Sequence, residues 1–284
     1  MAQFTNRAQL SYNNSTVNSN VVSGEILEVL SASKTAVRSI YAAGTDVAYV
    51  IGIVNTGSTA VTGLSVTDDL GAYPFGTQTL YPLTYADNSA RLYINGVLQA
   101  APTITAGPPL VFSGITLPAG SNALLVYEAT VNEFAPLDAG AAITNTATVT
   151  ALGITTPITV SETVTPIAAP ALTITKSIEP TTVTENGQLT YTFTIRNFGN
   201  TEADVGANAS VTDTFDPILN GITVTLNGTT LAEGVGYTYV QTSGEFTTVP
   251  GVITVPAATS VQDPVTGEWS VTPGVAILTV SGTI

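Results

Sequence analysis

The sequence predicts an all-β protein built from two tandem antiparallel sandwiches, and its length, composition and punctuation carry that prediction. A chain of 284 residues is long enough for two hydrophobic cores. Threonine, valine and isoleucine fit a pleated, half-buried surface, and they recur between closely spaced glycines and prolines. No stretch repeats apolar residues at the spacing of an amphipathic helix, so we expect helix to be a minor component.

The composition excludes several classes of function. The chain contains no histidine and no cysteine. Ser-His-Asp and Cys-His nucleophile arrangements, the usual zinc ligands and disulfides are therefore ruled out. A formal net charge of −14 disfavours nucleic acid, whose phosphates are neutralised by lysine and arginine. We expect a non-enzymatic protein that needs no cofactor and no metal.

Neither membrane insertion nor secretion is indicated by the sequence. Residues 139–161 are uncharged, but they alternate and include threonine, asparagine, glycine and proline, which is not the pattern of a membrane span. The N-terminus lacks the basic start and apolar run of a secretory signal. The C-terminal residues show neither a hydrophobic tail nor a basic cluster for wall anchoring. We expect a chain that is mature as given or is assembled without the general export route.

An internal repeat divides the chain into two halves. Six blocks recur in the same order, which is a strong signal of duplication. Each block is a short alternating segment beside glycine, proline or asparagine turns, as in antiparallel sandwiches of immunoglobulin-like type. The matched blocks are Leu30–Lys34 with Leu172–Lys176, Ala48–Asn55 with Thr190–Asn197, Ser65–Asp68 with Ser210–Asp213, Leu92–Gly96 with Val224–Gly228, Ile115–Ala119 with Ile253–Ala257, and Ala123–Tyr127 with Ala276–Val280.

The repeat predicts four segments. Residues 1–22 form an N-terminal extension, residues 23–164 form the first immunoglobulin-like sandwich, and residues 172–284 form the second. Residues 165–171, which include Pro166 and Pro170, form a short and stiff linker.

The two sandwiches are predicted to differ in their last strand. The first continues into a strand at Ile143–Val149, whereas the second reaches Ile284 directly after its last matched block. The Thr-Asn-x-Ala pattern of that strand recurs at Phe4–Leu10, and Val22–Glu25 echoes Val160–Glu162.

A sandwich that lacks a strand exposes unpaired backbone, which an extended segment of another chain can complete. Such a head-to-tail contact does not close and generates filaments. The predicted donor strand presents Phe4, Asn6, Ala8, Leu10 and Tyr12 on one face. In the alternative, residues 1–22 fold back onto their own chain, closing a ring of modules or capping the first sandwich.

Alternation also directs one lysine, one aspartate and one asparagine of each module into an apolar interior. The first set is Lys34, Asp68 and Asn145, and the second set is Lys176 and Asp213 with Asn6 of a neighbouring chain. Lys34 and Lys176 are the only lysines of the chain and occupy the same place in the repeat.

Buried polar groups of this kind need partners, and two outcomes are open. The first is a hydrogen-bonded ion pair, or a lysine that extends to the rim of the sandwich. The second is chemistry, because burial lowers the pKa of a lysine and raises that of a carboxyl group. A neutral lysine amine can then attack the asparagine side chain and form an isopeptide bond. That bond would join Lys34 to Asn145 within a chain and Lys176 to Asn6 between chains, with Asp68 and Asp213 as proton shuttles.

The blocks resemble the bacterial surface repeat family known as domain of unknown function 11. The first copy shows its Leu-x-x-x-Lys strand at Leu30–Lys34, its Asn-x-Gly turn at Asn55–Gly57, its Val-x-Asp strand at Val66–Asp68 and its closing Thr-Asn-x-Ala strand at Thr144–Ala147. The second copy lacks the closing strand. Two such repeats of this size resemble the spore-appendage subunits of anaerobic spore-forming bacteria, which implies a surface structural role and assembly inside a mother cell.

These observations favour a structural subunit of an extracellular or spore-surface filament that has copies of itself as its partner. An alternative from another class is a surface adhesin whose sandwich loops recognise a ligand. A carbohydrate-active enzyme would need a pair of carboxylates in a cleft, and the sequence offers no such pair.

Overall fold

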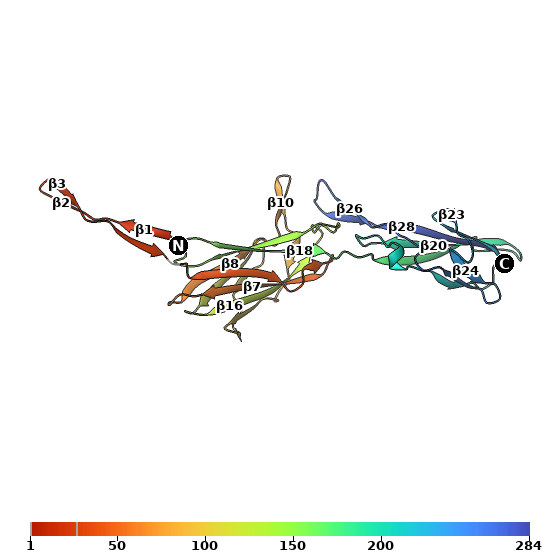
Figure 1. Ribbon diagram of the computed structural model, residues 1–284, viewed down its shortest axis with the longest axis horizontal. Helices are drawn as coiled ribbons and strands as arrows, with labels where there is room; N and C mark the ends of the chain where they lie inside the picture. The colour runs from red at the N-terminus through yellow and green to blue at the C-terminus, as the bar shows by residue number, and fades with distance from the viewer. Residues whose placement is uncertain (1, 27) are drawn as a thin grey trace.

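The computed structural model describes residues 2–26 and 28–284. Its parts lie in a row along one long axis, with a hairpin arm, the first sandwich and the second sandwich in chain order (Figure 1). The structure confirms the predicted fold class, all-β with two immunoglobulin-like sandwiches in tandem. Among the described residues the helical content is a single turn of 3-10 helix, η1 (Val205–Ala207).

The N-terminal arm is a two-stranded hairpin that extends away from the first sandwich (Figure 1). Strand β1 (Ala2–Asn6) pairs antiparallel with β4 (Val22–Ile26). Further out, β2 (Gln9–Tyr12) pairs with β3 (Ser15–Asn18) across a turn at residues 13–14, where both asparagines have positive φ. The sequence predicted a donor strand at residues 4–12 within an extension of residues 1–22, whereas the structure pairs this segment with a second strand that continues to residue 26.

The first sandwich consists of two six-stranded sheets. One sheet has the order β13-β12-β16-β7-β5, with β11 also paired to β16, and the other has the order β14-β15-β8-β17-β18-β6. A separate hairpin, β9–β10, projects from it. The strands are β5 (Leu30–Ala36), β6 (Ile40–Tyr41), β7 (Asp46–Asn55), β8 (Val61–Asp68), β9 (Tyr73–Phe75), β10 (Gln78–Leu80), β11 (Leu83–Tyr85), β12 (Arg91–Ile94), β13 (Val97–Leu98), β14 (Thr103–Thr105), β15 (Leu110–Leu117), β16 (Asn122–Val131), β17 (Ile143–Thr150) and β18 (Ile158–Pro166).

The second sandwich is smaller. A five-stranded sheet in the order β19-β20-β28-β22-β23 faces a three-stranded sheet in the order β21-β25-β24. A hairpin, β26–β27, stands apart from both sheets. The strands are β19 (Leu172–Glu179), β20 (Gln188–Asn197), β21 (Thr212–Thr214), β22 (Asn220–Leu226), β23 (Thr229–Thr230), β24 (Tyr237–Val240), β25 (Glu245–Thr248), β26 (Thr259–Gln262), β27 (Trp269–Thr272) and β28 (Gly274–Thr283).

The strand registers agree with the duplication seen in the sequence. Tyr127 of β16 lies opposite Tyr49 of β7, and Val280 of β28 lies opposite Tyr191 of β20 at the matching place in the second sandwich. Inward positions alternate along β7 and β16, so every second side chain of these strands enters the core.

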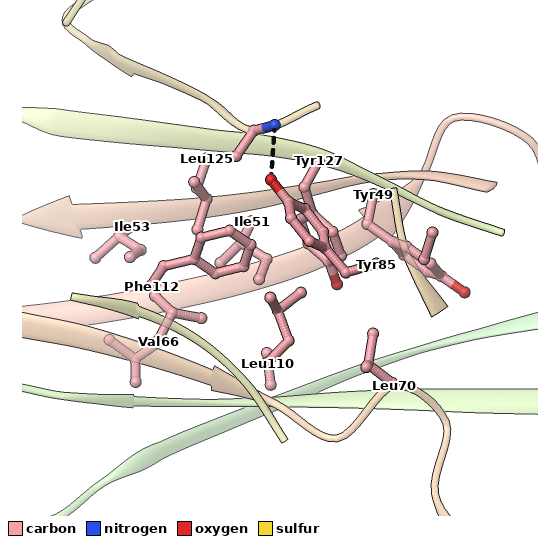
Figure 2. Close-up of a cluster of buried hydrophobic side chains, with 14 of the residues drawn as sticks. Tyr49, Ile51, Ile53, Val66, Leu70, Tyr85, Leu110, Phe112, Leu125 and Tyr127 are labelled. Atoms are coloured by element: carbon pink, nitrogen blue, oxygen red, sulfur yellow. Dashed lines mark hydrogen bonds between the residues drawn. The ribbon is translucent and has the colours of Figure 1, made fainter. Parts of the chain in front are cut away.

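Aromatic rings occupy the middle of the first core (Figure 2). The ring of Tyr127 stacks on Tyr49 with centroids 5.6 Å apart and contacts Phe112 at 5.2 Å. Tyr85 of the same cluster accepts a hydrogen bond from the backbone N–H of Ala90 at 3.3 Å. Rings of this size dominate the apolar surface that such a core buries.

The junction between the sandwiches involves more than the predicted linker. Strand β18 continues through Pro166, so the connecting segment is residues 167–171. Beside it, the β26–β27 hairpin of the second sandwich meets the β9–β10 region of the first: Gln262 Nε2 donates to Tyr73 Oη at 3.0 Å, and Trp269 N–H donates to the Glu133 carbonyl at 2.8 Å. Figure 1 shows both hairpins above the junction. These contacts brace the two sandwiches against each other.

Candidate functional site

The first predicted set of polar residues converges inside the first sandwich. Lys34 comes from β5, Asp68 from the end of β8 and Asn145 from β17. All three are buried, and the side chains of Lys34 and Asp68 have no exposed surface. Lys34 Nζ donates to Asp68 Oδ2 at 2.6 Å, and Asp68 Oδ1 accepts from the N–H of Leu70 at 3.0 Å. This buried ion pair therefore links the two sheets of the first sandwich.

Tyr127 links the asparagine to this pair. Its hydroxyl donates to Asp68 Oδ2 at 2.5 Å and accepts from Asn145 Nδ2 at 3.2 Å. Sequence patterns alone did not identify Tyr127 as part of this site. A signal was available, because the matched blocks put tyrosine at this position in the first sandwich and Val280 in the second.

Burial dominates the electrostatics of the first site. Desolvation lowers the pKa of Lys34, although the neighbouring Asp68 carboxylate opposes the shift. Burial and the Asp68 charge raise the pKa of Tyr127 well above its ordinary value, so this hydroxyl remains a hydrogen-bond donor. Asn145 Oδ1 and the Tyr49 hydroxyl are buried without a hydrogen-bond partner among the described residues. The site thus combines a lysine that loses its proton more easily with an asparagine carbonyl that is not fully satisfied.

The second pair, Lys176 and Asp213, forms the same contact in a different environment. Lys176 of β19 donates a short hydrogen bond to Asp213 Oδ2 of β21. Here 40% of the lysine side chain and 19% of the aspartate side chain are exposed, in contrast to none in the first pair. Lys176 Nζ lies 4.3 Å from the ring centroid of Tyr191, which stacks on Phe215.

The second pair is exposed because its sandwich has no counterparts of β17 and β18 among the described residues. In the first sandwich β8 lies between β15 and β17, but β21 is an edge strand whose one partner in the described part of the chain is β25. The sequence predicted a difference of one strand, and the structure shows a difference of two. Leu172 and Ile174 of β19 are 40% and 52% exposed, whereas Leu30 at the corresponding place is buried.

Within one chain, Asn6 is not brought to Lys176. The predicted donor residues lie on the arm, at the end of the molecule opposite the second sandwich (Figure 1). All of them are exposed, and they belong to the hairpin arm rather than to the core of a sandwich. The residues are Phe4, Asn6, Ala8, Leu10 and Tyr12.

A pair of buried asparagines supports the same corner in both sandwiches. Asn55 Nδ2 donates to the carbonyls of Thr59, Leu117 and Pro118, and its Oδ1 accepts from the N–H of Gly57. Asn197 makes the same set of bonds with Thr201, Val255, Pro256 and Gly199. These side chains hold the matched Asn-x-Gly turns, and they account for that sequence motif by structure.

The described part of the chain contains no group of three or more metal-ligating side chains arranged around a common point. Within the same residues, no helix combines the length and apolar character needed to cross a bilayer.

Comparisons with known proteins give structural likenesses only. No family model and no curated protein matches the chain. A variant of BcpA, the major pilin subunit of Bacillus cereus, is 12% identical over 94% of this chain and 70% of its own length, with a TM-score of 0.40. The collagen-binding domain of a Staphylococcus aureus adhesin is 11% identical over 50% of this chain and 99% of its own, with a TM-score of 0.32.

A family 123 glycoside hydrolase from Clostridium perfringens is also similar, at 12% identity and a TM-score of 0.30. The match covers 49% of this chain, which spans only 28% of that enzyme. Likenesses at these identities and TM-scores carry no argument about what the present chain binds or assembles with.

Proposed function

We propose that this protein is a structural subunit of a bacterial surface filament and that it assembles head to tail with copies of itself. The observation that carries the proposal is the contrast between the two Lys–Asp pairs. The first is enclosed by β17 and β18 of its own chain, whereas the second faces an open sheet edge at β21. An open edge beside exposed apolar residues is a template for strand addition.

The arm provides the segment that fills this edge. It carries the Thr-Asn-x-Ala pattern of β17 and lies at the end of the molecule opposite the second sandwich (Figure 1). An arm that enters the second sandwich of another copy leaves its own second sandwich open for the next copy. The contact is heterologous and non-closing, which generates a filament.

Isopeptide bonds would lock both sandwiches. In the first, neutral Lys34 Nζ attacks Asn145 Cγ, a new N–C bond forms and the bond from Cγ to Nδ2 breaks. Asp68 takes a proton from the attacking nitrogen and delivers it to the leaving nitrogen, which departs as ammonia. Lys176, Asp213 and Asn6 of a neighbouring subunit would react in the same way.

The surface location follows from the same proposal. A filament of acidic, low-charge β-sandwiches has no catalytic or cofactor requirement and can be an appendage of a cell or a spore. The resemblance to the domain of unknown function 11 family and to spore-appendage subunits agrees with this role. Immunogold labelling of intact cells and spores with an antibody against the chain would locate the subunit.

Denaturing electrophoresis of native filaments tests the proposal. We expect a ladder of multimers that survives boiling, and its loss in Lys176→Ala and in Asn6→Ala. The matched variant Lys34→Ala should keep the ladder, because its bond lies within one subunit. Intact mass should fall by one ammonia for each bond formed.

Two results would contradict parts of this proposal. If filaments dissociate fully on boiling and the subunit mass is unchanged, no isopeptide bonds form and the subunits are joined by strand addition alone. A chain without residues 2–26 that still polymerises would remove the arm from assembly. If the native chain and the chain without residues 2–26 are both monomeric and bind a surface ligand equally well, the adhesin alternative holds.

A further inference from the structure

The gap in the second sandwich has the width of two strands. In the first sandwich β17 pairs with β8 and with β18, and β18 in turn pairs parallel with β6 and lies beside β5. In the second sandwich neither position is occupied by a described residue, so β21 and β19 both have a free flank. A single added strand would pair with β21 and leave the apolar side chains of β19 uncovered.

The arm has the architecture of the missing pair. Strands β1 and β4 pair antiparallel, as β17 and β18 do. Cross-strand partners share a face, so Asn6 with Val22 and Phe4 with Gly24 form one side of the ribbon, and Thr5 with Ser23 form the other. The first side matches the buried face of β17–β18, and the second matches its polar outer face.

Side-chain volumes also match across the two hairpins. Buried Ile143 of β17 lies opposite buried Val164 of β18. At the corresponding place in the arm, Phe4 lies opposite Gly24, and a Cβ on Gly24 would fall 2.5 Å from Phe4 Cζ. A large ring over a glycine replaces two branched residues of intermediate size. Both faces of the free arm are in solvent, where a two-stranded ribbon is only marginally stable.

We propose that the arm donates both of its strands, β1–β2 in place of β17 and β3–β4 in place of β18, as one hairpin that completes the second sandwich of a neighbouring subunit. This inference rests on the proposed head-to-tail assembly. The register follows from β17 when Asn6 takes the place of Asn145. Ala147 pairs with Asp68 in the first sandwich, so Ala8 should lie opposite Asp213. Val149 pairs with Val66, so Leu10 should lie opposite Val211.

The second sandwich has space for Leu10 at that position. A cavity of about 160 Å³ opens beside Val211, and its walls include Leu172, Ile174 and Ala209. In the first sandwich the corresponding Val149 is fully buried. Leu10 is 65% exposed on the free arm, so its insertion would remove apolar surface from water on both partners.

The hairpin also explains how the filament continues. In the chain, β18 is followed within a few residues by β19 of the next sandwich, and β4 is followed within a few residues by β5. When the hairpin is donated, the first sandwich of the donor subunit should therefore follow the second sandwich of the acceptor in the way that the second sandwich follows the first within one chain. The filament becomes a continuous row of sandwiches in which subunit boundaries resemble module boundaries.

Engineered cysteines test the register, because the native chain has none. Leu10→Cys combined with Val211→Cys should form an intermolecular disulfide in filaments under mild oxidation. The matched pair Tyr12→Cys with Val211→Cys is displaced by two residues along the strand and should form little. Filaments with neither disulfide, or with the second dominant, would overturn the proposed register.

A charge at residue 22 tests the second strand. The counterpart of Val22 is Glu162, which lies opposite Asn145 and whose charge partly offsets the lowering of the Lys34 pKa by burial. Val22→Glu should therefore assemble within about twofold of the native rate, whereas Val22→Lys faces Lys176 and should assemble at least about tenfold more slowly. Equal rates for the two variants, together with the Leu10–Val211 disulfide, would show that only one strand is donated while assembly through the arm stands. If the native chain does not assemble into filaments, the proposed function itself is refuted.

Discussion

The two Lys–Asp pairs show how the same residues acquire different properties from the strands around them. Both pairs come from the same places in the repeat and make the same bond between two sheets. The first lies under β17 and β18 with no exposed side-chain surface, and the second is partly open to water. Desolvation by burial lowers the pKa of the enclosed Lys34. Addition of the missing strands to the second sandwich would bury Lys176 in the same way and so make the second site reactive.

Replacing each lysine in turn should give the largest difference between the two sites. In the chain without residues 2–26 and with Asn145→Ala, which prevents the proposed Lys34–Asn145 bond, Lys34→Met leaves Asp68 as an unpaired buried charge and should lower the free energy of unfolding of the first sandwich by about 3–5 kcal/mol. Lys176→Met breaks a partly exposed pair and should cost less than about 1 kcal/mol. Denaturant unfolding followed by tyrosine fluorescence measures both. Equal losses would mean that the second pair is as enclosed in solution as the first.

The asparagine corners should behave alike in both sandwiches. Asn55→Ala and Asn197→Ala each leave three backbone carbonyls without their donor, and each should cost about 2–4 kcal/mol. The expected equality separates this structural motif from the Lys–Asp sites, where the effects differ. A large loss at one corner only, measured in the same unfolding experiment, would argue that the second sandwich is loosely formed without its added strands.

Tyr127→Phe tests the residue that the first site has and the second lacks. Removal of the hydroxyl takes one donor from Asp68 and one acceptor from Asn145, and should lower the stability of the first sandwich by about 1–2 kcal/mol. It should also slow the Lys34–Asn145 bond, because the asparagine is no longer held toward the aspartate. The bond between Lys176 and Asn6 should form at its native rate, since Val280 occupies this position there. Time-resolved intact mass of freshly folded chains distinguishes the two bonds.

The sequence predicted those features that alternation and duplication determine locally. The matched blocks Ala48–Asn55 with Thr190–Asn197 and Ala123–Tyr127 with Ala276–Val280 became corresponding strands, and the faces of β5, β8 and β17 were enough to bring Lys34, Asp68 and Asn145 together. Features that depend on contacts between distant segments were missed. The asparagine turn at residues 13–14 was a usable hairpin signal, but the pairing of β1 with β4 also depends on side-chain complementarity between Phe4 and Gly24. The brace of β26–β27 against the first sandwich left no local pattern at all.

The smallest expected effect is a pH dependence confined to the first site. Asn145→Ala prevents the bond and leaves Lys34 with a lowered pKa in the folded state. Between that lowered value and the unfolded value of 10.5, the unfolded chain binds more protons, so stability should increase with pH across this window. Below the window the cost of a buried charged amine applies in full. Adding Lys34→Met to Asn145→Ala should abolish the slope, whereas adding Lys176→Met should preserve it. Denaturant midpoints measured at several pH values between neutrality and the titration of tyrosine give the slope, and a slope that persists without Lys34 would assign it to another group.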